Sequence, residues 1–412
     1  MKSIKKFTDE VGKYENDINS YIKSIKKLPL PYTGNKRKVL FNIYSAIKKH
    51  NIEFKSVIDA FSGSSSVSLL FKSMGKKVIS NDILTSSFAN SVALVGTPIK
   101  MSIDEQEYLL NNKNPNKNNF VEDNYLGLHF NNDKICKYDK FTLQECKHLD
   151  NFRANIDNLS GFRLQCLGLT ANFSVIQRLP FGSIDASHDI IKHRKKQRDT
   201  YGSGGSKHDR RIGIYYDSNM NLNFHKWFKK YISDFTSIRF NGSFKEEVVI
   251  KPFLENATNY RNIHTTPLCL KTNMNVIDLL SCSLSDNVDC IYFDPPYGGQ
   301  SSDYALMYKF FEEYIYSKPI EDLSHCNKSK TFVNKSTYED NFIDMLNSAK
   351  KIPIWIFSYN NTSWKDINYI VGIISQYNRK VVVETLTDEY RYLYRKNNGR
   401  TLKGSEYIIF AY

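Results

Sequence analysis

The sequence lacks the marks of secreted, membrane-spanning and zinc-binding proteins. Its seven cysteines are scattered and no two form a C-x-x-C pair, so neither a disulfide framework nor a zinc site is indicated. No uninterrupted apolar stretch approaches the ~18 residues of a transmembrane helix, and the charged N-terminus does not resemble a signal peptide. We therefore expect a cytoplasmic protein that uses no membrane and no metal.

Acidic residues are the scarcer charged class. The chain has 57 Lys and Arg residues against 43 Asp and Glu residues, which gives a formal net charge of +14 and a sequence pI near 9.2. Such an excess favours a polyanionic partner, most often nucleic acid. Lysine-rich surfaces also occur in chains from AT-rich genomes, so charge alone does not identify the partner.

Residues 55–98 have the pattern of a βαβ unit. Apolar, β-branched runs at residues 55–61 and 77–80 flank a helical pattern over 67–73, and such a crossover implies parallel strands. Further strands are expected at 268–272, 289–293, 354–357, 380–384 and 406–411. The last two have no clear helical pattern between them. We therefore expect an α/β fold whose mostly parallel sheet includes an antiparallel last strand.

The spacing of these strands divides the chain into four parts. In residues 1–28, apolar positions alternate at spacings of three and four, which predicts an amphipathic helix. This helix either packs on the chain's own body or forms a coiled-coil arm for a dimer. The main domain is expected in two parts, 29–100 and 265–412. The intervening residues 101–264 are too long for an ordinary connection and are predicted to form an inserted, mainly helical domain.

A basic segment lies within this insert. Residues 192–211 contain eight Lys or Arg against two Asp around a Gly-Ser-rich centre of flexible composition. Such a segment can become ordered on phosphates, so we expect nucleic-acid contact here in preference to a merely solvated loop. The expected DNA-binding residues are Lys192, Arg194, Lys195, Lys196, Arg198, Lys207, Arg210 and Arg211.

The most specific motif is Asp294-Pro295-Pro296-Tyr297. It follows an apolar run at residues 290–293 that predicts a buried strand. Neither proline donates a backbone hydrogen bond, so the strand must end there. The resulting lip, at the carboxyl end of a parallel strand, carries a carboxylate, free carbonyls and an aromatic ring. That combination suits an exocyclic amine on a planar heterocycle.

Two further acids end earlier strands. Asp59 precedes Phe61 and Gly63 in a small-residue turn, which lets a ligand approach backbone N–H groups. Asp82 follows the second strand, where an acid accepts hydrogen bonds from ribose hydroxyls, although Asp also caps helices. The chain lacks the G-x-G-x-x-G loop of a pyrophosphate site. A nucleoside-like cofactor is therefore favoured, and a nicotinamide-dependent dehydrogenase is disfavoured.

Together with Pro31-Tyr32-x-Gly34-x-Lys36, these motifs resemble the Dam-like (α-type) DNA adenine methyltransferases. Their order is similar too, with cofactor motifs first, a target-recognition insert next and the catalytic motif last. The resemblance implies a Rossmann-like class I methyltransferase sheet and S-adenosyl-L-methionine as cofactor. The cofactor-binding residues that it implies are Tyr32, Lys36, Asp59, Phe61, Gly63, Asp82 and Asp294.

The resemblance also implies direct methyl transfer to adenine N6 in double-stranded DNA. Asp294 and the Pro295 carbonyl would accept hydrogen bonds from the amine and stabilise its developing positive charge. Tyr297 would stack on the target base, which must leave the duplex. Lys36 would meet either the cofactor carboxylate or Asp294. A restriction-modification, epigenetic or phage-protection role follows, with a cognate restriction endonuclease as a candidate partner.

The sequence departs from the family pattern in two places. Ser65 stands where many members have a second glycine, so the loop either narrows the space for the methionine moiety or bends differently. After the third strand, the acid that often faces the cofactor adenine is represented by Asn273 or by Asp278.

Other activities stay open at this stage. Cytosine N4 methylation uses the same chemistry, and an RNA or protein substrate would keep the fold. A catalytically silent DNA-binding scaffold would use residues 1–28 to recruit a partner. Asp294 and Asp82 argue against the scaffold, and the large basic insert favours duplex DNA.

Overall fold

The structure is a computed structural model. It describes residues 18–30, 32, 34–96, 99–111, 113–126, 141, 143–176, 223–237, 247–249, 269–298, 303–360, 363–397 and 400–412, with the backbone alone at 247–249, 269–270, 387–397 and 400–404. The basic segment 192–211 and residues 1–17 lie outside these ranges, so the predictions made for them stay predictions.

An eight-stranded sheet in the order β3-β4-β2-β1-β5-β6-β8-β7 organises the described residues. All neighbouring strands are parallel except that β8 runs antiparallel to both β6 and β7. The α/β fold with its antiparallel last strand is therefore confirmed. The strands are β1 (Ser56–Asp59), β2 (Lys77–Asn81), β3 (Glu247–Val249), β4 (Cys269–Thr272), β5 (Cys290–Phe293), β6 (Ile354–Asn360), β7 (Val381–Asn397) and β8 (Arg400–Ala411).

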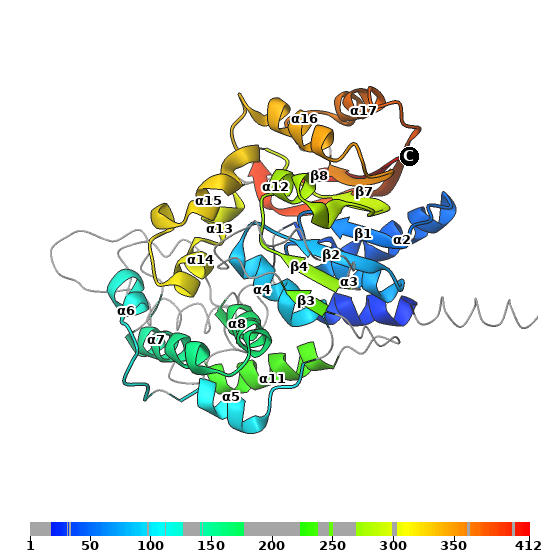
Figure 1. The fold of residues 1–412 in the computed structure, drawn as a ribbon. Helices are drawn as coiled ribbons and strands as arrows, with labels where there is room; N and C mark the ends of the chain where they lie inside the picture. The colour runs from blue at the N-terminus through cyan, green and yellow to red at the C-terminus, as the bar shows by residue number, and fades with distance from the viewer. Residues whose placement is uncertain are drawn as a thin grey trace, which may run out of the picture.

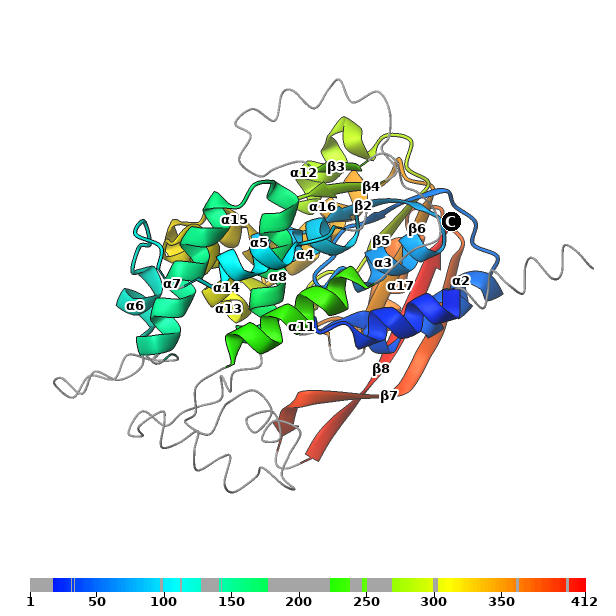
Figure 2. The ribbon, with the colours of Figure 1, turned by 90° about the horizontal axis from the view of Figure 1, so that it is seen from below.

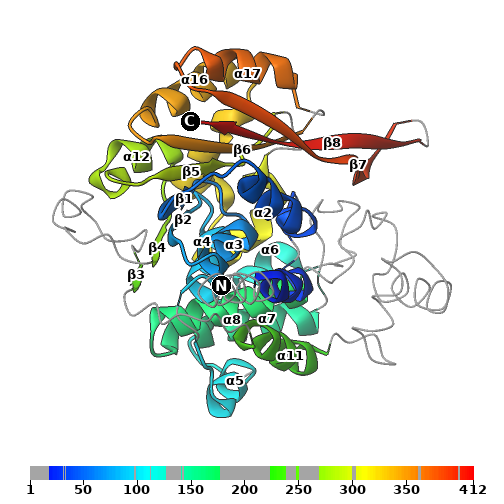
Figure 3. The same cartoon turned by 90° about the vertical axis from the view of Figure 1, so that its right-hand side faces the viewer.

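Helices cover both faces of the sheet, which is why β1 and β5 are buried at every position. Figure 3 shows one group of helices above the sheet and another below it. The lower group comprises α2 (Leu40–Lys49), α3 (Ser66–Ser73) and α4 (Thr85–Leu94). The upper group comprises α12 (Val276–Ser281), α16 (Tyr338–Ser348) and α17 (Ile367–Ser375), and its apolar residues form a separate buried cluster with that face of the sheet.

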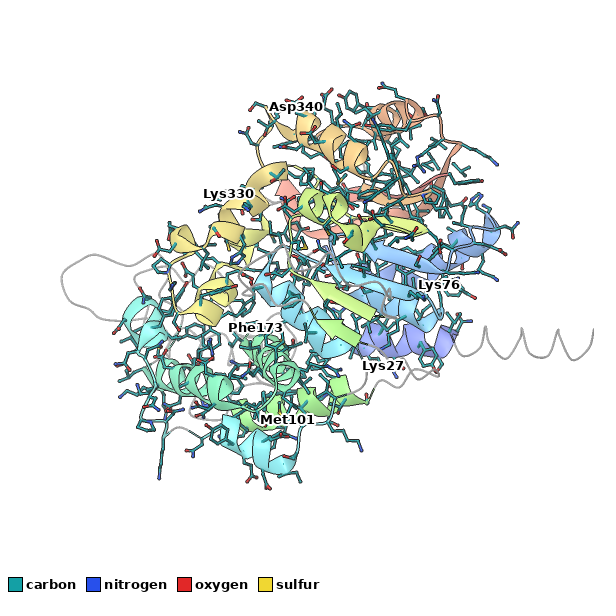
Figure 4. The ribbon with its side chains drawn as sticks, in the orientation of Figure 1. Lys27, Lys76, Met101, Phe173, Lys330 and Asp340 are labelled. Atoms are coloured by element: carbon teal, nitrogen blue, oxygen red, sulfur yellow. The ribbon has the colours of Figure 1, made fainter. Side chains whose placement is uncertain are left out.

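Helices from the predicted insert pack below the sheet, toward the lower left of Figure 1. They are α5 (Ile103–Leu109), α6 (Phe120–Tyr125), α7 (Leu143–Asn158), α8 (Phe162–Ile176) and α11 (Phe224–Thr236). Phe173 of α8 points toward α14 (Lys309–Tyr316) and lies 4.4 Å from Phe311 between ring centroids (Figure 4). These helices share one hydrophobic cluster with the lower face of the sheet. The insert is thus continuous with the main core where it is described.

The described part of the predicted N-terminal helix packs against the rest of the chain. Residues 18–27 are helical, and Ile18, Ile22, Ile25 and Leu28 are buried in the same cluster as α2. Their apolar seam therefore faces the chain's own body. The dimer arm predicted for residues 1–28 rests on its first 17 residues, which lie outside the described part.

The sheet differs from the sequence prediction at its two edges. β3 comes from within the predicted insert and pairs in parallel with β4, so the segment 101–264 contributes a strand to the main sheet. β7 and β8 are much longer than the predicted 380–384 and 406–411, and Figure 2 shows them extending together beyond the other strands. The outer halves of these two strands are rich in charged residues. Their sequence therefore lacks the apolar pattern by which a strand is predicted.

The carboxyl ends of the central strands define one edge of the sheet. Asp59 at the end of β1 is in register with Tyr292 of β5 and with Ser80 of β2. Asp82 and Asp294 each follow directly after their strands. Parallel pairing therefore brings three acids from distant parts of the sequence to the edge where open α/β sheets bind ligands. No helix in the described part of the chain is long and apolar enough to cross a membrane.

Candidate active site

Two adjacent cavities lie along this edge. The larger has about 700 Å³ of space, part of it open to solvent, and is lined by residues that include Asp82, Met274 and Phe332. The smaller, of about 290 Å³, is lined by residues that include Asp59 and Gly63. Four residues border both cavities and so mark their junction, namely Tyr32, Gly34, Phe61 and Asp294.

Asp82 anchors the wall of the larger cavity. One carboxylate oxygen accepts the backbone N–H of Gly63 at 2.8 Å and the other accepts that of Leu84 at 2.9 Å. Burial raises the pKa of Asp82 to about 7, although these two hydrogen bonds oppose the shift. Each oxygen keeps a second lone pair for a ligand hydroxyl. Asp82 thus ties the loop after β1 to the loop after β2 and still faces the cavity.

The turn after β1 brings backbone close to an aromatic ring. Gly63 has φ +48°, and a Cβ on it would lie 2.6 Å from the Tyr32 ring, so a side chain at Gly63 would displace Tyr32. The Tyr32 ring also stacks on Tyr308 at 4.6 Å between centroids. This close packing fixes one side of the cavity junction.

The structure shows how the turn after β1 accommodates Ser65 where many family members have a second glycine. Ser65 adopts φ +59°, the left-handed conformation that glycine favours, and caps α3. Its hydroxyl lies 2.8 Å from that of Ser91 on α4, which in turn lies 3.1 Å from that of Ser62 and 2.9 Å from that of Ser80. The buried hydroxyl network holds the turn in the conformation that a second glycine would adopt freely.

Asp59 presents an unsatisfied oxygen in the smaller cavity's wall. The side chain is 1% exposed, and Oδ2 accepts the Ser68 hydroxyl at 2.6 Å. Oδ1 is buried and has no hydrogen-bond partner among the described residues. Burial raises the pKa of Asp59 to about 7, with the Ser68 hydrogen bond opposing the shift. A buried acceptor of this kind suits a ligand that donates from an amine.

The lip after β5 is held by a buried cation. The Lys36 ammonium lies 2.9 Å from Asp294 Oδ1 and donates to the Tyr297 hydroxyl at 3.2 Å. That hydroxyl donates to Asp294 and lies 3.3 Å from the Ser358 carbonyl. Burial disfavours the ammonium, but the carboxylates of Asp294 and Glu406 outweigh it and raise the pKa of Lys36 well above its ordinary value. Of the two partners expected for Lys36, the structure shows Asp294.

Glu312 is a buried acid that the sequence analysis missed. Located on α14 and 0% exposed, it accepts the backbone N–H groups of Thr85 at 3.1 Å and Ser86 at 2.8 Å. These belong to the first turn of α4, directly after the loop that lines the larger cavity. His325 Nε2 lies 2.8 Å from the same carboxylate. The only sequence signal is an acid within an aromatic-rich helix, which also fits a solvated surface position.

Neither of the two residues predicted to face the cofactor adenine after the third strand lines a cavity. Asn273 donates to the carbonyls of Asp82 and Ile83, both at 2.8 Å, and thereby supports the loop after β2. The lining comes from the next residues, Met274, Asn275 and Val276, together with Phe332 from η6 (Ser329–Phe332). Asp278 lies on α12 and is not among the residues that line either cavity.

The predicted site residues converge in space. Every residue expected to bind the cofactor lines one of the two cavities, and Pro296 lines the larger. Pro295 is buried beside Asp294. The ring of Tyr297 packs edge-on against Tyr359 at 5.4 Å between centroids. The roles assigned to these side chains stay predictions.

Comparisons with known proteins agree with this geometry. Residues 32–178, which include Tyr32, Asp59 and Asp82, match the family described as D12 class N6 adenine-specific DNA methyltransferase. Over these residues the chain is similar to that family. It is also 24% identical over 371 residues to the Type II methyltransferase M2.HphI of Haemophilus parahaemolyticus, across 90% of this chain and 94% of that protein. Both similarities support site-specific methylation of adenine N6 in DNA, with a methyl donor as second substrate.

Replacing Glu312 tests its structural role. In Glu312→Gln, the side-chain amide has one carbonyl oxygen for the two backbone N–H groups of α4, so one of them loses its acceptor. We expect the free energy of unfolding to fall by ~1–3 kcal/mol, measured by denaturant unfolding. As a control, Glu339→Gln removes a half-exposed partner of Lys365 and should cost less than ~1 kcal/mol. Equal losses in the two variants would contradict a special role for Glu312.

Proposed function

We propose that this chain transfers a methyl group from S-adenosyl-L-methionine to the N6 amine of an adenine flipped out of double-stranded DNA. The observation that carries the proposal is the position of the Asp294 carboxylate at the junction of the two cavities. A ligand filling both cavities would have its middle beside this carboxylate. In the proposed cofactor, that middle is the sulfonium that separates the methionine and adenosine moieties.

The side chains around the cavities fit that cofactor. Asp82 would accept hydrogen bonds from the ribose hydroxyls, and the apolar lining from Met274, Val276 and Phe332 suits the adenine ring. In the smaller cavity, the unpartnered Oδ1 of Asp59 would accept from the amino group of the methionine moiety. When bound, the cofactor supplies an electrophilic methyl group on a positively charged sulfur.

Asp294 and Pro295 would act on the target amine. The lone pair of adenine N6 is delocalised into the ring, so the amine is a poor nucleophile. Hydrogen bonds from N6 to the Asp294 carboxylate and the Pro295 carbonyl would draw the nitrogen toward tetrahedral geometry. The same acceptors would stabilise the positive charge that develops as the new N–C bond forms and the S–CH3 bond breaks, after which the amine would lose one proton to solvent. No covalent enzyme intermediate is needed.

Tyr297 and the target base come together only after the base leaves the duplex. Stacking on an aromatic ring is worth ~1–3 kcal/mol per base. The Tyr297 hydroxyl is already held by Lys36 and Asp294. These bonds fix the hydroxyl end of the ring next to the carboxylate that would receive the amine.

Recognition of the DNA is assigned to the insert. We infer that residues 101–264 form the target-recognition domain and that the basic segment 192–211 contacts the phosphate backbone, because the segment carries a local excess of positive charge. The similarity to a Type II methyltransferase supports a restriction-modification context, with a cognate endonuclease as partner. We also propose that residues 1–28 can form a contact between two copies of the chain.

Cofactor affinity should depend on pH. The pKa values of Asp59 and Asp82 are both raised to about 7, so these acids are protonated below that pH and ionised above it. Only the ionised forms accept hydrogen bonds through both oxygens. We expect S-adenosylmethionine to bind more tightly at about pH 8 than at about pH 6, measured by isothermal titration calorimetry. The dependence should shrink in Asp82→Asn, and an unchanged dependence there would argue against a ribose contact.

Replacing the catalytic carboxylate tests the activity itself. We expect Asp294→Ala to abolish methylation while cofactor binding largely survives, since Asp59 and Asp82 remain. Unmethylated plasmid would be incubated with the enzyme, digested to nucleosides and analysed by mass spectrometry, which separates N6-methyladenine from N4-methylcytosine. Asp322→Ala, at an exposed acid, serves as the control. Substantial turnover by Asp294→Ala would overturn the assignment of Asp294, and N4-methylcytosine from the wild type would overturn the target base.

Charge reversal in the basic segment tests the proposed DNA contact. The double variant Lys195→Glu and Lys196→Glu should weaken DNA binding and make it less sensitive to salt, because fewer counterions are released per complex. Fluorescence anisotropy of labelled duplex DNA at several salt concentrations measures both effects. Lys350→Glu, at an exposed lysine near the amino end of β6, is the matched control. A salt slope equal to that of the wild type would indicate a solvated loop.

A further inference from the structure

A second carboxylate lies beneath the catalytic lip. Glu406 on β8 is 2% exposed, and its Oε1 lies 3.9 Å from the Lys36 ammonium. The same ammonium lies 2.9 Å from Asp294. One buried cation is therefore shared between two carboxylates. Glu406 belongs to none of the motifs that the sequence analysis identified.

Sheet register brings Glu406 to this position. It pairs with Asn360 at the end of β6, and β6 is the direct neighbour of β5, whose last residue directly precedes Asp294. Among the described residues, the titratable groups that face it are Lys36, Asp294 and the Tyr297 hydroxyl. From β6 the neighbours are the uncharged Ser358 and Asn360. The side chains of β7 next to it, around residue 387, are outside the described set.

Glu406 has few polar partners among the described residues. Its Oε2 is buried and has no hydrogen-bond partner among the described residues, and its Oε1 lies at the distance limit of an ion pair. A buried carboxylate costs folding free energy unless its partners offset the loss of hydration, and the nearest described partner is the Lys36 ammonium. A residue placed at such a cost next to a catalytic group calls for a functional reason.

Charge balance supplies that reason. Asp294 is proposed to stabilise positive charge on the target amine, yet a full positive charge already lies 2.9 Å away on Lys36. Lys36 and Asp294 alone form a neutral pair, which attracts a cation weakly. With Glu406 included, one cation faces two carboxylates, and the group keeps a net negative charge where the amine would become positive.

We propose that Glu406 is a positioning residue for methyl transfer, which by sharing Lys36 leaves Asp294 with the negative charge that the developing cationic amine requires. This inference rests on the proposed function, because it assumes that Asp294 receives the amine. Glu406 touches neither substrate in this scheme and acts only through Lys36 and Asp294.

The effect should depend on pH. Burial raises the pKa of Glu406 to about 7, Lys36 opposes the shift and Asp294 adds to it. The carboxyl is therefore neutral well below pH 7 and charged above it. Its contribution to the rate should be absent in acid and present in base. Asp59 and Asp82 also titrate near pH 7, so the informative quantity is the ratio between the wild type and a variant that keeps both acids.

Single-turnover methylation provides this ratio. The rate constant for tritiated methyl transfer would be measured with enzyme in excess over plasmid sites and with saturating S-adenosylmethionine, from about pH 5.5 to about pH 8.5. We expect Glu406→Gln to match the wild type at the acid end and to be ~3–10-fold slower at the basic end. A separate titration of the cofactor should give nearly the same half-saturating concentration in both proteins. Glu384→Gln, which removes a β7 carboxylate paired with Lys49 and His50, should track the wild type throughout.

The variant Glu406→Asp is the control for an effect of misfolding. It keeps the charge and should retain most of the pH dependence, whereas a purely steric role would leave the isosteric Glu406→Gln close to the wild type and make the shorter Glu406→Asp slow at every pH. A wild-type to Glu406→Gln ratio that is constant across pH, or equal rates at the basic end, would overturn the proposal. Absence of any methylation by the wild type would instead count against the proposed function, so the two failures are distinguishable.

Discussion

The ion pair between Lys36 and Asp294 is the interaction on which the rest of the site depends. It joins a segment that precedes β1 to the lip that follows β5, with a separation of 2.9 Å and little exposure of either side chain. Removing two charges from water is costly, and the cost is offset only where geometry and further hydrogen bonds are good. Here the Tyr297 hydroxyl bonds both partners. The pair therefore orients the lip and the phenol ring together.

The two cavities depend on the same edge of the sheet but on different supports. The smaller is built on the turn after β1, where Gly63 lies against Tyr32 and the serine network holds Ser65 in a left-handed conformation. The larger is built on the loop after β2, which Asn273 and Glu312 hold from behind. Because Glu312 comes from a helix that follows residues 294–297, the chain after these residues also shapes the wall of the larger cavity. Asp82 links the two supports through Gly63 and Leu84.

Much of this arrangement could be predicted from local patterns. A proline pair after an apolar run ends a strand whatever surrounds it, so the position of Asp294 at a strand end was predictable. The βαβ pattern implied parallel strands, and that placed Asp59 and Asp82 on the same edge. Glu312 and Glu406 were not predictable, because a single acid in a helix or a strand has the same local signature whether it is buried or solvated. The strand β3 is three residues long and carries too short a pattern to detect.

The sequence by itself determined the order of the motifs, the mostly parallel sheet with its antiparallel last strand, and the acids that reach the ligand-binding edge. These depend on backbone restrictions and on apolar periodicity, which act over a few residues. Only the tertiary structure decided that Lys36 faces Asp294, that Glu406 shares that lysine from the far end of the chain, and that Glu312 holds the first turn of α4. Those contacts join residues distant in sequence, and their energies come from burial and charge, which exist only once the chain has packed.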